Sequence, residues 1–114
     1  MAVYDWDMCT LGDPLCDLGT LVAVWGEGVA AGYPMPSQTE GFMTSEQAVE
    51  RYGERAGRDV ALIPYYVVFG TFKMAVVLQQ IYVRFHRGQT QDERFEGMGK
   101  VAAFLFQLAA DRRP

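Results

Sequence analysis

A long apolar stretch in the middle of the chain, residues 60–83, most constrains what this sequence can fold into. A helix that is apolar on all sides belongs in a protein core or in a membrane, and a membrane span needs about 20 apolar residues. We therefore expect a buried central helix over residues 64–87, ending before Gly88, and no membrane contact. The membrane alternative is disfavoured because five residues interrupt the stretch: Pro64, Gly70, Lys73, Gln79 and Gln80.

A helix start signal precedes this stretch near the N-terminus. The dipeptide Asp13-Pro14 is typical of a helix start, with aspartate as the N-cap and proline in the first helical position. We expect this helix over residues 14–25, because Gly26 and Gly28 follow it.

Two capping boxes predict the remaining helices. Thr44 with Gln47 has the spacing of a capping box, and the apolar stripe behind it predicts a helix over residues 45–56. Thr90 with Glu93 has the same spacing and predicts a helix over residues 91–111. The apolar residues of this last helix recur every three or four positions: Phe95, Met98, Val101, Ala102, Leu105 and Leu108.

The first residues of the chain are rich in strand-forming side chains. Residues 2–7 are expected to form one short β-strand, or half of a hairpin whose partner is not evident in the sequence. The predicted fold class is therefore mainly α, with about four helices behind one short N-terminal strand. The length of 114 residues fits one domain, residues 1–114.

Composition excludes some classes of function. The formal net charge is −4 and the pI is about 4.8, which is opposite to the basic footprint of a nucleic-acid-binding protein. The two cysteines, Cys9 and Cys16, match no metal-binding or redox spacing. The N-terminus does not resemble a signal peptide, so we expect a reduced, cytoplasmic protein.

The chemically richest part of the sequence is residues 3–19, which hold four aspartates among apolar residues. Asp5 falls within the predicted strand, where a carboxylate is costly unless it is paired or bound to a hard cation such as Mg²⁺. Hydrogen bonding of Asp5 to nearby backbone groups is the alternative. Asp13 is expected to cap a helix, and Asp17 to interact with the dipole of its first turn.

The chain resembles the aminoglycoside phosphotransferase-like kinases, most closely the branch associated with acyl-CoA dehydrogenase family members ten and eleven. The resemblance covers nearly the whole chain, because further matches extend from Glu50 to Phe95. The most specific part is a fixed spacing of three short motifs near the N-terminus: Asp5-Trp6-Asp7, Gly12-Asp13-Pro14 and Asp17-Leu18.

The resemblance implies a role for each of four aspartates. Asp5 would correspond to the kinase aspartate that holds Mg²⁺ against the nucleotide phosphates. Asp7 occupies a usually acidic position and would be a second candidate for the metal. Asp13 and Asp17 would be structural: Asp13 turns the chain into a helix, and Asp17 hydrogen-bonds the backbone of the catalytic loop. The complete enzymes need Mg²⁺ and ATP or GTP, and transfer the γ-phosphoryl group to a hydroxyl.

Other parts of the family pattern are missing. The catalytic loop HGDxxxxN is absent, and the single histidine, His86, has no matching context. His86 instead fits a partner for a helix C-terminus. The chain therefore resembles the last third of such a kinase, the helical part of the large lobe. We assign it no catalytic or cofactor-binding residue, and we expect it to be inactive and to bind no cofactor alone.

The missing parts also predict a partner. Apolar side chains near the N-terminus are expected to be exposed, and large exposed apolar patches usually find a partner. That partner is either a second copy, pairing through the N-terminal strand, or the missing N-terminal part of the same enzyme. A non-catalytic helical interaction module is the alternative function. Acyl-CoA dehydrogenase activity is rejected, because no flavin site is recognisable. The side chains expected to be exposed are Val3, Trp6, Met8 and Leu11.

Overall fold

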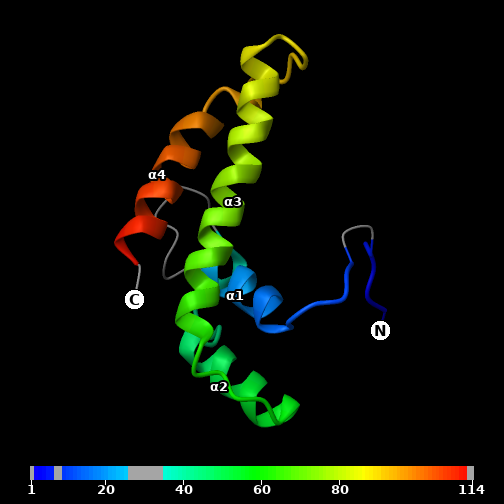
Figure 1. The fold of residues 1–114 in the computed structure, drawn as a ribbon, viewed down its shortest axis with the longest axis vertical. Helices are drawn as coiled ribbons and strands as arrows, with labels where there is room; N and C mark the ends of the chain where they lie inside the picture. Colours follow the sequence, from blue (N-terminus) through cyan, green and yellow to red (C-terminus); the bar gives the residue numbers. More distant parts are fainter. Residues whose placement is uncertain (1, 7–8, 26–34, 113–114) are drawn as a thin grey trace.

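The computed structural model describes residues 2–6, 9–25 and 35–112, and this part of the chain is mainly α-helical (Figure 1). It contains the helices α1 (Leu15–Ala23), α2 (Ser45–Ala56), α3 (Ile63–His86) and α4 (Met98–Asp111). Two short 3-10 helices, η1 (Pro36–Gln38) and η2 (Glu93–Phe95), lie between them. The described residues include no β-strand.

Helix α3 is the central element of the molecule. It runs along the long axis, with α1 and α4 packed against it and α2 near the end at which α3 begins (Figure 1). Helix α4 returns antiparallel to α3. The buried side chains are mostly small, so the helices approach one another closely. They come from α1, α3 and α4: Leu15, Leu18, Ala23, Thr71, Ala75, Ala102, Leu105 and Ala109.

Glycines allow the closest of these approaches, between α1 and α3. A Cβ atom added at Gly19 would lie 2.5 Å from the backbone carbonyl group of Tyr66. A Cβ atom added at Gly70 would lie 2.8 Å from the Cα atom of Thr20. Because both obstacles are backbone atoms, the two helices cross at a distance that only glycine permits.

The helix predicted over residues 45–56 is α2, Ser45–Ala56. Its capping box is present, because the Gln47 backbone N–H donates to the Thr44 hydroxyl and the Gln47 side chain accepts from the Thr44 backbone N–H. The helix ends at Gly57, which has the left-handed φ of 60° that glycine adopts without strain.

Two other helix ends agree closely with the expected ones. The long helix predicted over residues 64–87 is α3, and Gly88 follows it with a φ of 69°. The first helix ends at Ala23, and the glycines expected to stop it, Gly26 and Gly28, lie outside the described residues.

The predicted start of the last helix is wrong. Helix α4 begins at Met98, and no capping box joins Thr90 to Glu93. Instead, the Asp92 carboxylate accepts from the backbone N–H of Arg94 at 3.1 Å and binds the Arg94 guanidinium. These local bonds favour the short helix η2 and delay α4 by several residues.

The predicted strand over residues 2–7 is not formed at the described positions 2–6. Asp5 has a φ of 68°, which is incompatible with a strand. The segment folds on itself, because the Trp6 indole N–H donates to the Val3 carbonyl and the Cys9 N–H to the Trp6 carbonyl. The physical reason is that a strand needs a neighbouring strand for its backbone groups, and the described residues provide none.

Helix α3 is central but much less buried than expected. Its buried residues are Gly70, Thr71 and Ala75, whereas Tyr65 and Phe72 are 58% and 50% exposed. By length and composition alone, α3 is also apolar enough to cross a membrane. The prediction of an all-round buried helix is therefore wrong for one side of α3, because none of the described residues covers it.

Candidate functional site

Asp13 lies at the centre of the best-defined polar site of the described residues. One carboxylate oxygen, Oδ1, accepts from the Leu15 backbone N–H at 2.9 Å, at the start of α1. The other, Oδ2, accepts from the Tyr66 hydroxyl at 2.6 Å. The helix begins at Leu15 with Pro14 as N-cap, one residue later than expected. Asp13 thus joins the start of α1 to α3, and both of these hydrogen bonds are structural.

This pair shifts two pKa values in opposite directions. The Tyr66 hydrogen bond, followed by the Leu15 N–H and the charge of Arg58, holds the pKa of Asp13 below its usual value. The hydrogen bond to Asp13 raises the pKa of Tyr66 to about 12. Both shifts favour the charged carboxylate and the neutral phenol at neutral pH.

Asp17 and Asp5 differ from Asp13 in having no partner within the described part of the chain. Asp17 is exposed in the first turn of α1, and its carboxylate makes no hydrogen bond there. Asp5 is exposed on the N-terminal segment, and its carboxylate is likewise unbonded to the described residues. Asp7 lies outside the described residues.

The N-terminal segment that carries Asp5 lies apart from the helices (Figure 1). Its apolar side chains face solvent: Val3 is 72%, Trp6 63% and Leu11 101% exposed. Met8, expected to behave alike, lies outside the described residues. Within the described residues, no three His, Cys, Asp or Glu side chains lie close enough together to hold a metal ion.

His86 lies in the last turn of α3, and its ring stacks on that of Tyr82. The ring centroids are 5.9 Å apart, with an angle of 26° between the planes. This position at a helix C-terminus is the one expected from the sequence.

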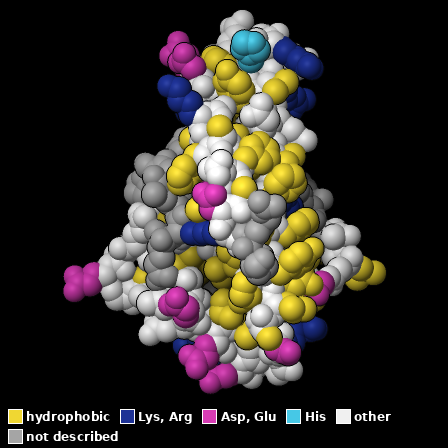
Figure 2. Space-filling model, turned by 60° about the vertical axis from the view of Figure 1, so that its left-hand side comes forward, with side chains coloured by type: hydrophobic (Ala, Val, Ile, Leu, Met, Phe, Trp, Pro, Cys, Tyr) yellow, Lys and Arg dark blue, Asp and Glu magenta, His cyan; other side chains and the backbone are white. Residues whose placement is uncertain are grey.

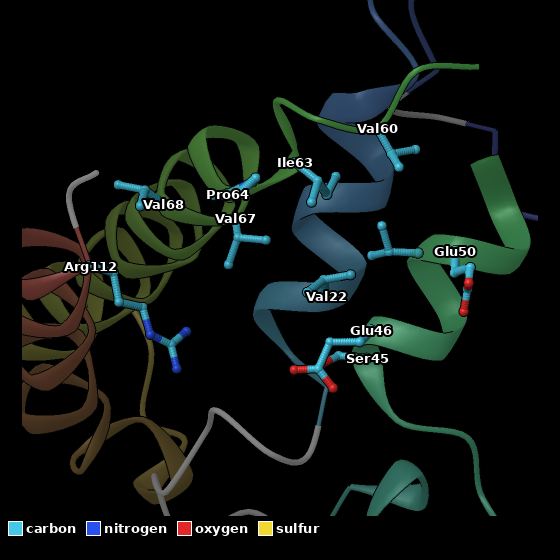
Figure 3. A pocket seen from close by; sticks show the side chains of 11 residues that line it. Val22, Ser45, Glu46, Glu50, Val60, Ile63, Pro64, Val67, Val68 and Arg112 are labelled. Carbon is cyan, nitrogen blue, oxygen red and sulfur yellow. The ribbon is translucent and has the colours of Figure 1, made fainter.

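An apolar pocket of about 630 Å³ lies between α1, α2 and the start of α3 (Figure 3). Its lining is mostly aliphatic and includes Val22, Ile63 and Val67. Glu46 and Glu50 of α2 lie on one side, and Arg112, just after α4, lies across from them (Figure 3). The sequence analysis did not predict this pocket, because its apolar lining comes mainly from residues 60–68, a stretch expected to be covered in the core.

A second apolar hollow, the aromatic groove, lies between α3 and α4 and has a volume of about 450 Å³. Hydrophobic side chains are spread over the one face of the molecule that Figure 2 shows. None of the residues that line the groove is charged. Its principal lining residues are Tyr65, Phe69 and Phe72 of α3 and Phe106, Ala109 and Ala110 of α4.

These features define a mainly α-helical protein, whose described residues form four α-helices and contain no complete catalytic constellation. The chain is 27% identical over 125 residues to acyl-CoA dehydrogenase family member 10 of Mus musculus, an alignment that covers 97% of this chain. It is 25% identical over 119 residues to probable acyl-CoA dehydrogenase IBR3 of Arabidopsis thaliana, covering 96% of this chain. The alignments span 11% and 14% of those relatives.

No model of a known protein family matches the chain. No solved structure matches it either. The similarity is therefore a distant one to a small part of two large proteins.

Proposed function

We propose that this chain is the helical C-terminal part of the large lobe of a small-molecule phosphotransferase, and that it is inactive by itself. The parent enzyme would transfer the γ-phosphoryl group of ATP or GTP, with Mg²⁺, to a hydroxyl group. The proposal rests on the motif spacing around Asp5, Asp13 and Asp17 and on the distant similarity over nearly the whole chain.

The observation that carries the proposal is the contrast between Asp13 and Asp17. Asp13 is fully engaged in holding α1 to α3. Asp17, one turn further along, presents an exposed carboxylate with no bond to the described residues. A free acceptor in this position suits the proposed task of Asp17, which is to hydrogen-bond the backbone of a catalytic loop supplied by another part of the enzyme.

The described residues contain no group of three or more His, Cys, Asp or Glu side chains that could hold a metal ion. Magnesium ions in proteins are held by one or two carboxylates together with substrate phosphates and water. Asp5 offers one exposed carboxylate, without a cluster of further ligands among the described residues. We therefore place Mg²⁺ and nucleotide in the complete enzyme, with Asp5 as one ligand and Asp7 as a candidate second, and derive no reaction step for this chain.

The genomic sequence immediately upstream of the codon for Met1 tests the proposal. An in-frame HGDxxxxN motif a short distance upstream supports it, because this motif supplies the base and a second metal ligand. An in-frame stop codon or an unrelated sequence contradicts it.

A kinase assay on the purified chain tests the claim of inactivity. With Mg²⁺ and ATP or GTP, and with a panel of aminoglycosides and small alcohols as acceptors, we expect no transfer above the no-protein control. Transfer that is lost in Asp5→Ala would contradict this claim. Asp59→Ala is the matched control, because Asp59 is an exposed aspartate that caps a turn through the Ala61 N–H.

One observation favours a second candidate, a non-catalytic helical interaction module. The exposed apolar side chains on α3 and the N-terminal segment are more than a self-sufficient domain of this size normally shows. Titration with Mg²⁺ and nucleotide separates the two candidates. Binding that Asp5→Ala abolishes favours a residual phosphotransferase site, and no binding together with an unrelated upstream sequence favours the module.

The dehydrogenase activity in the names of the two relatives is not proposed for this chain. The chain corresponds to 11% and 14% of those proteins, and 114 residues are too few for that activity. A purified chain with the absorption spectrum of bound flavin would contradict this view.

A further inference from the structure

The pocket between α1, α2 and the start of α3 combines an apolar interior with an acidic side (Figure 3). Aliphatic side chains from all three helices line it, among them Val22, Val49 and Val67. Small-molecule sites commonly lie between helices, have volumes of about 300 to 1,000 Å³, and are lined mainly by apolar side chains with a few polar groups. The volume of this pocket, about 630 Å³, lies within that range.

Glu46 and Glu50 form the acidic side of the pocket. They lie one turn apart on α2, so their carboxylates are neighbours of like charge on the helix surface. The Glu46 carboxylate accepts from the Thr44 hydroxyl at 3.3 Å, and neither carboxylate forms an ion pair with a described residue. Two negative charges therefore border an apolar surface, and no described cation is paired with them.

Arg112 lies across the pocket from these carboxylates (Figure 3). It contributes one positive charge against two negative charges, and it has an interaction of its own. The charged residues that line the pocket therefore carry a net negative charge. This charge favours a cationic group on the α2 side, because opposite charges attract more strongly beside an apolar wall than in open water.

We propose that this pocket binds a small molecule that combines a compact aliphatic body with one ammonium group. The aliphatic body lies against Val22, Ile63 and Val67, and the ammonium group donates to the carboxylates of Glu46 and Glu50. Removal of the body from water supplies most of the affinity. The carboxylates supply the preference for a cation over a neutral or an anionic group.

The site is independent of the residues assigned to phosphoryl transfer. Asp5, Asp13 and Asp17 are not among the residues that line the pocket. The described residues alone provide its aliphatic floor and its acidic side, so we expect ligand binding to need no other part of the enzyme. The inference does not rest on the proposed function, and each can fail without the other.

A polypeptide segment suits this pocket less well than a small amine. The backbone N–H and C=O groups of such a segment need hydrogen-bond partners when they are buried. Most of the residues that line the pocket have aliphatic side chains, which offer no such partners. An aliphatic amine has a single polar group, and this group meets the two carboxylates.

Three probes with the same hydrocarbon body test the charge requirement: aminoadamantane, which is cationic at neutral pH, adamantanol, which is neutral, and adamantane carboxylate, which is anionic. Each is titrated to about 10 mM into the purified chain, with NMR detection of labelled methyl groups. We expect the amine to bind with a Kd on the order of 1 mM or below. The alcohol should bind about 5-fold more weakly, and the carboxylate more weakly still.

The methyl signals locate the bound probe. The largest shifts should be those of Val22, Ile63 and Val67. No binding of the amine, equal binding of the three probes, or shifts confined to other residues overturns the proposal. Each of these outcomes leaves the phosphotransferase assignment untouched.

Substitution of both carboxylates tests the acidic side. The double variant Glu46→Gln with Glu50→Gln keeps the size of the side chains and removes both charges. We expect it to weaken amine binding by about 5-fold and to change alcohol binding by less than about twofold. Glu54→Gln is the matched control, because Glu54 is exposed one turn further along α2 and does not line the pocket. Equal effects of the double variant and the control, or an unchanged preference for the amine, overturn the proposal.

A larger side chain tests the apolar part of the site. Val49→Phe fills part of the pocket from α2, a helix with no buried residue, so circular dichroism should show an unchanged helix content. We expect the binding of both the amine and the alcohol to weaken by about 5-fold or more, because the aliphatic body loses its place in the pocket. Amine binding as tight as in the natural chain would place the ligand elsewhere and overturn the proposal.

Discussion

Asp13 shows how one side chain combines a local and a long-range role. Its bond to the Leu15 N–H is local and follows from the helix start signal in the sequence. Its bond to the Tyr66 hydroxyl joins residues that are 53 positions apart. Because both partners donate to the carboxylate, the ionised form of Asp13 and the neutral form of Tyr66 are favoured together.

The first prediction concerns the pH range over which this bond stabilises the fold. The pKa of Asp13 is lowered on folding. The contribution of the ionised Asp13 carboxylate to the free energy of unfolding is therefore present above the unfolded pKa of Asp13, near 4, and is lost as the pH falls through the lower folded pKa. The pKa of Tyr66 is raised to about 12, so its contribution is present below its unfolded pKa and is lost as the pH rises through about 12.

Tyr66→Phe should therefore lower the thermal midpoint by a constant amount between about pH 5 and 9, within both of these limits. The difference from the natural chain should shrink in acid and above about pH 10. Thermal unfolding of both proteins across the pH range measures it. Tyr65→Phe is the matched control, since no described residue hydrogen-bonds the Tyr65 hydroxyl, and a similar loss in it would argue against this explanation.

The second prediction concerns the cap of α2. Thr44→Ala removes the acceptor for the Gln47 N–H and should destabilise α2 by about 1 kcal/mol. Amide hydrogen exchange of the α2 backbone measures this loss of helix stability locally. Because none of the residues of α2 is buried, the helix is expected to open without unfolding of the core. Thr39→Ala, an exposed threonine outside the capping box, should stay within about 0.5 kcal/mol of the natural chain. Unchanged exchange in Thr44→Ala would contradict the assignment.

At the scale of elements, the crossing of α1 and α3 depends on glycine. Gly19 and Gly70 place helix backbones in direct contact, and the buried side chains around them are small. Only residues with small side chains permit this close approach, so the helices at the crossing enclose a small, closely packed core. Helix α2 has far fewer contacts with the other helices, and only Val49 of its apolar side chains lines the pocket of Figure 3.

The third prediction follows from this crossing. Alanine normally stabilises a helix interior by about 1 kcal/mol relative to glycine. In Gly70→Ala, however, the new Cβ would lie 2.8 Å from the Thr20 Cα, and a backbone atom cannot move aside alone. We expect a net loss of about 1 to 3 kcal/mol in urea unfolding.

Gly97→Ala serves as the control for this change. Gly97 has a φ of −74° and open space where its Cβ would be, so its substitution should change stability by less than about 0.5 kcal/mol. A Gly70→Ala protein as stable as the natural chain would show that the helices separate without cost.

At the scale of the whole molecule, the helical body and the N-terminal segment are distinct. The described residues of the segment hydrogen-bond only within it, and the segment lies apart from the helices (Figure 1). The body holds the core, the pocket and the aromatic groove. Its stability should therefore be independent of the segment.

The fourth prediction tests this independence. Deleting residues 2–11 should leave the helix content unchanged. The thermal midpoint should shift by less than about 2 °C, which corresponds to a change of less than about 0.5 kcal/mol in the free energy of unfolding. A markedly larger fall in the thermal midpoint, or a loss of helix content, would contradict this independence.

The candidate site was only partly accessible to sequence reasoning. The sequence indicated Asp13 as a residue at a helix start, but it contained no signal for its bond to Tyr66, which looked like one more aromatic residue of the central helix. The metal assignment of Asp5 came from a motif spacing and remains a prediction. The pocket beside α2 was missed, since the apolar residues at 60–68 that line it look the same in the sequence whether a neighbour covers them or not.

The sequence by itself determined the existence of the four helices, the bounds of α2 and the end of α3, because their signals are local; it did not determine the start of α4. The capping box at Thr44, the glycines that follow α2 and α3, and the three- and four-residue apolar periodicity act within a turn or two of each end. Only the tertiary structure decided which apolar faces are covered and whether residues 2–6 pair as a strand. Both depend on whether another segment packs alongside. A strand needs a neighbour for its backbone hydrogen bonds, and an apolar face needs a neighbour that removes it from water.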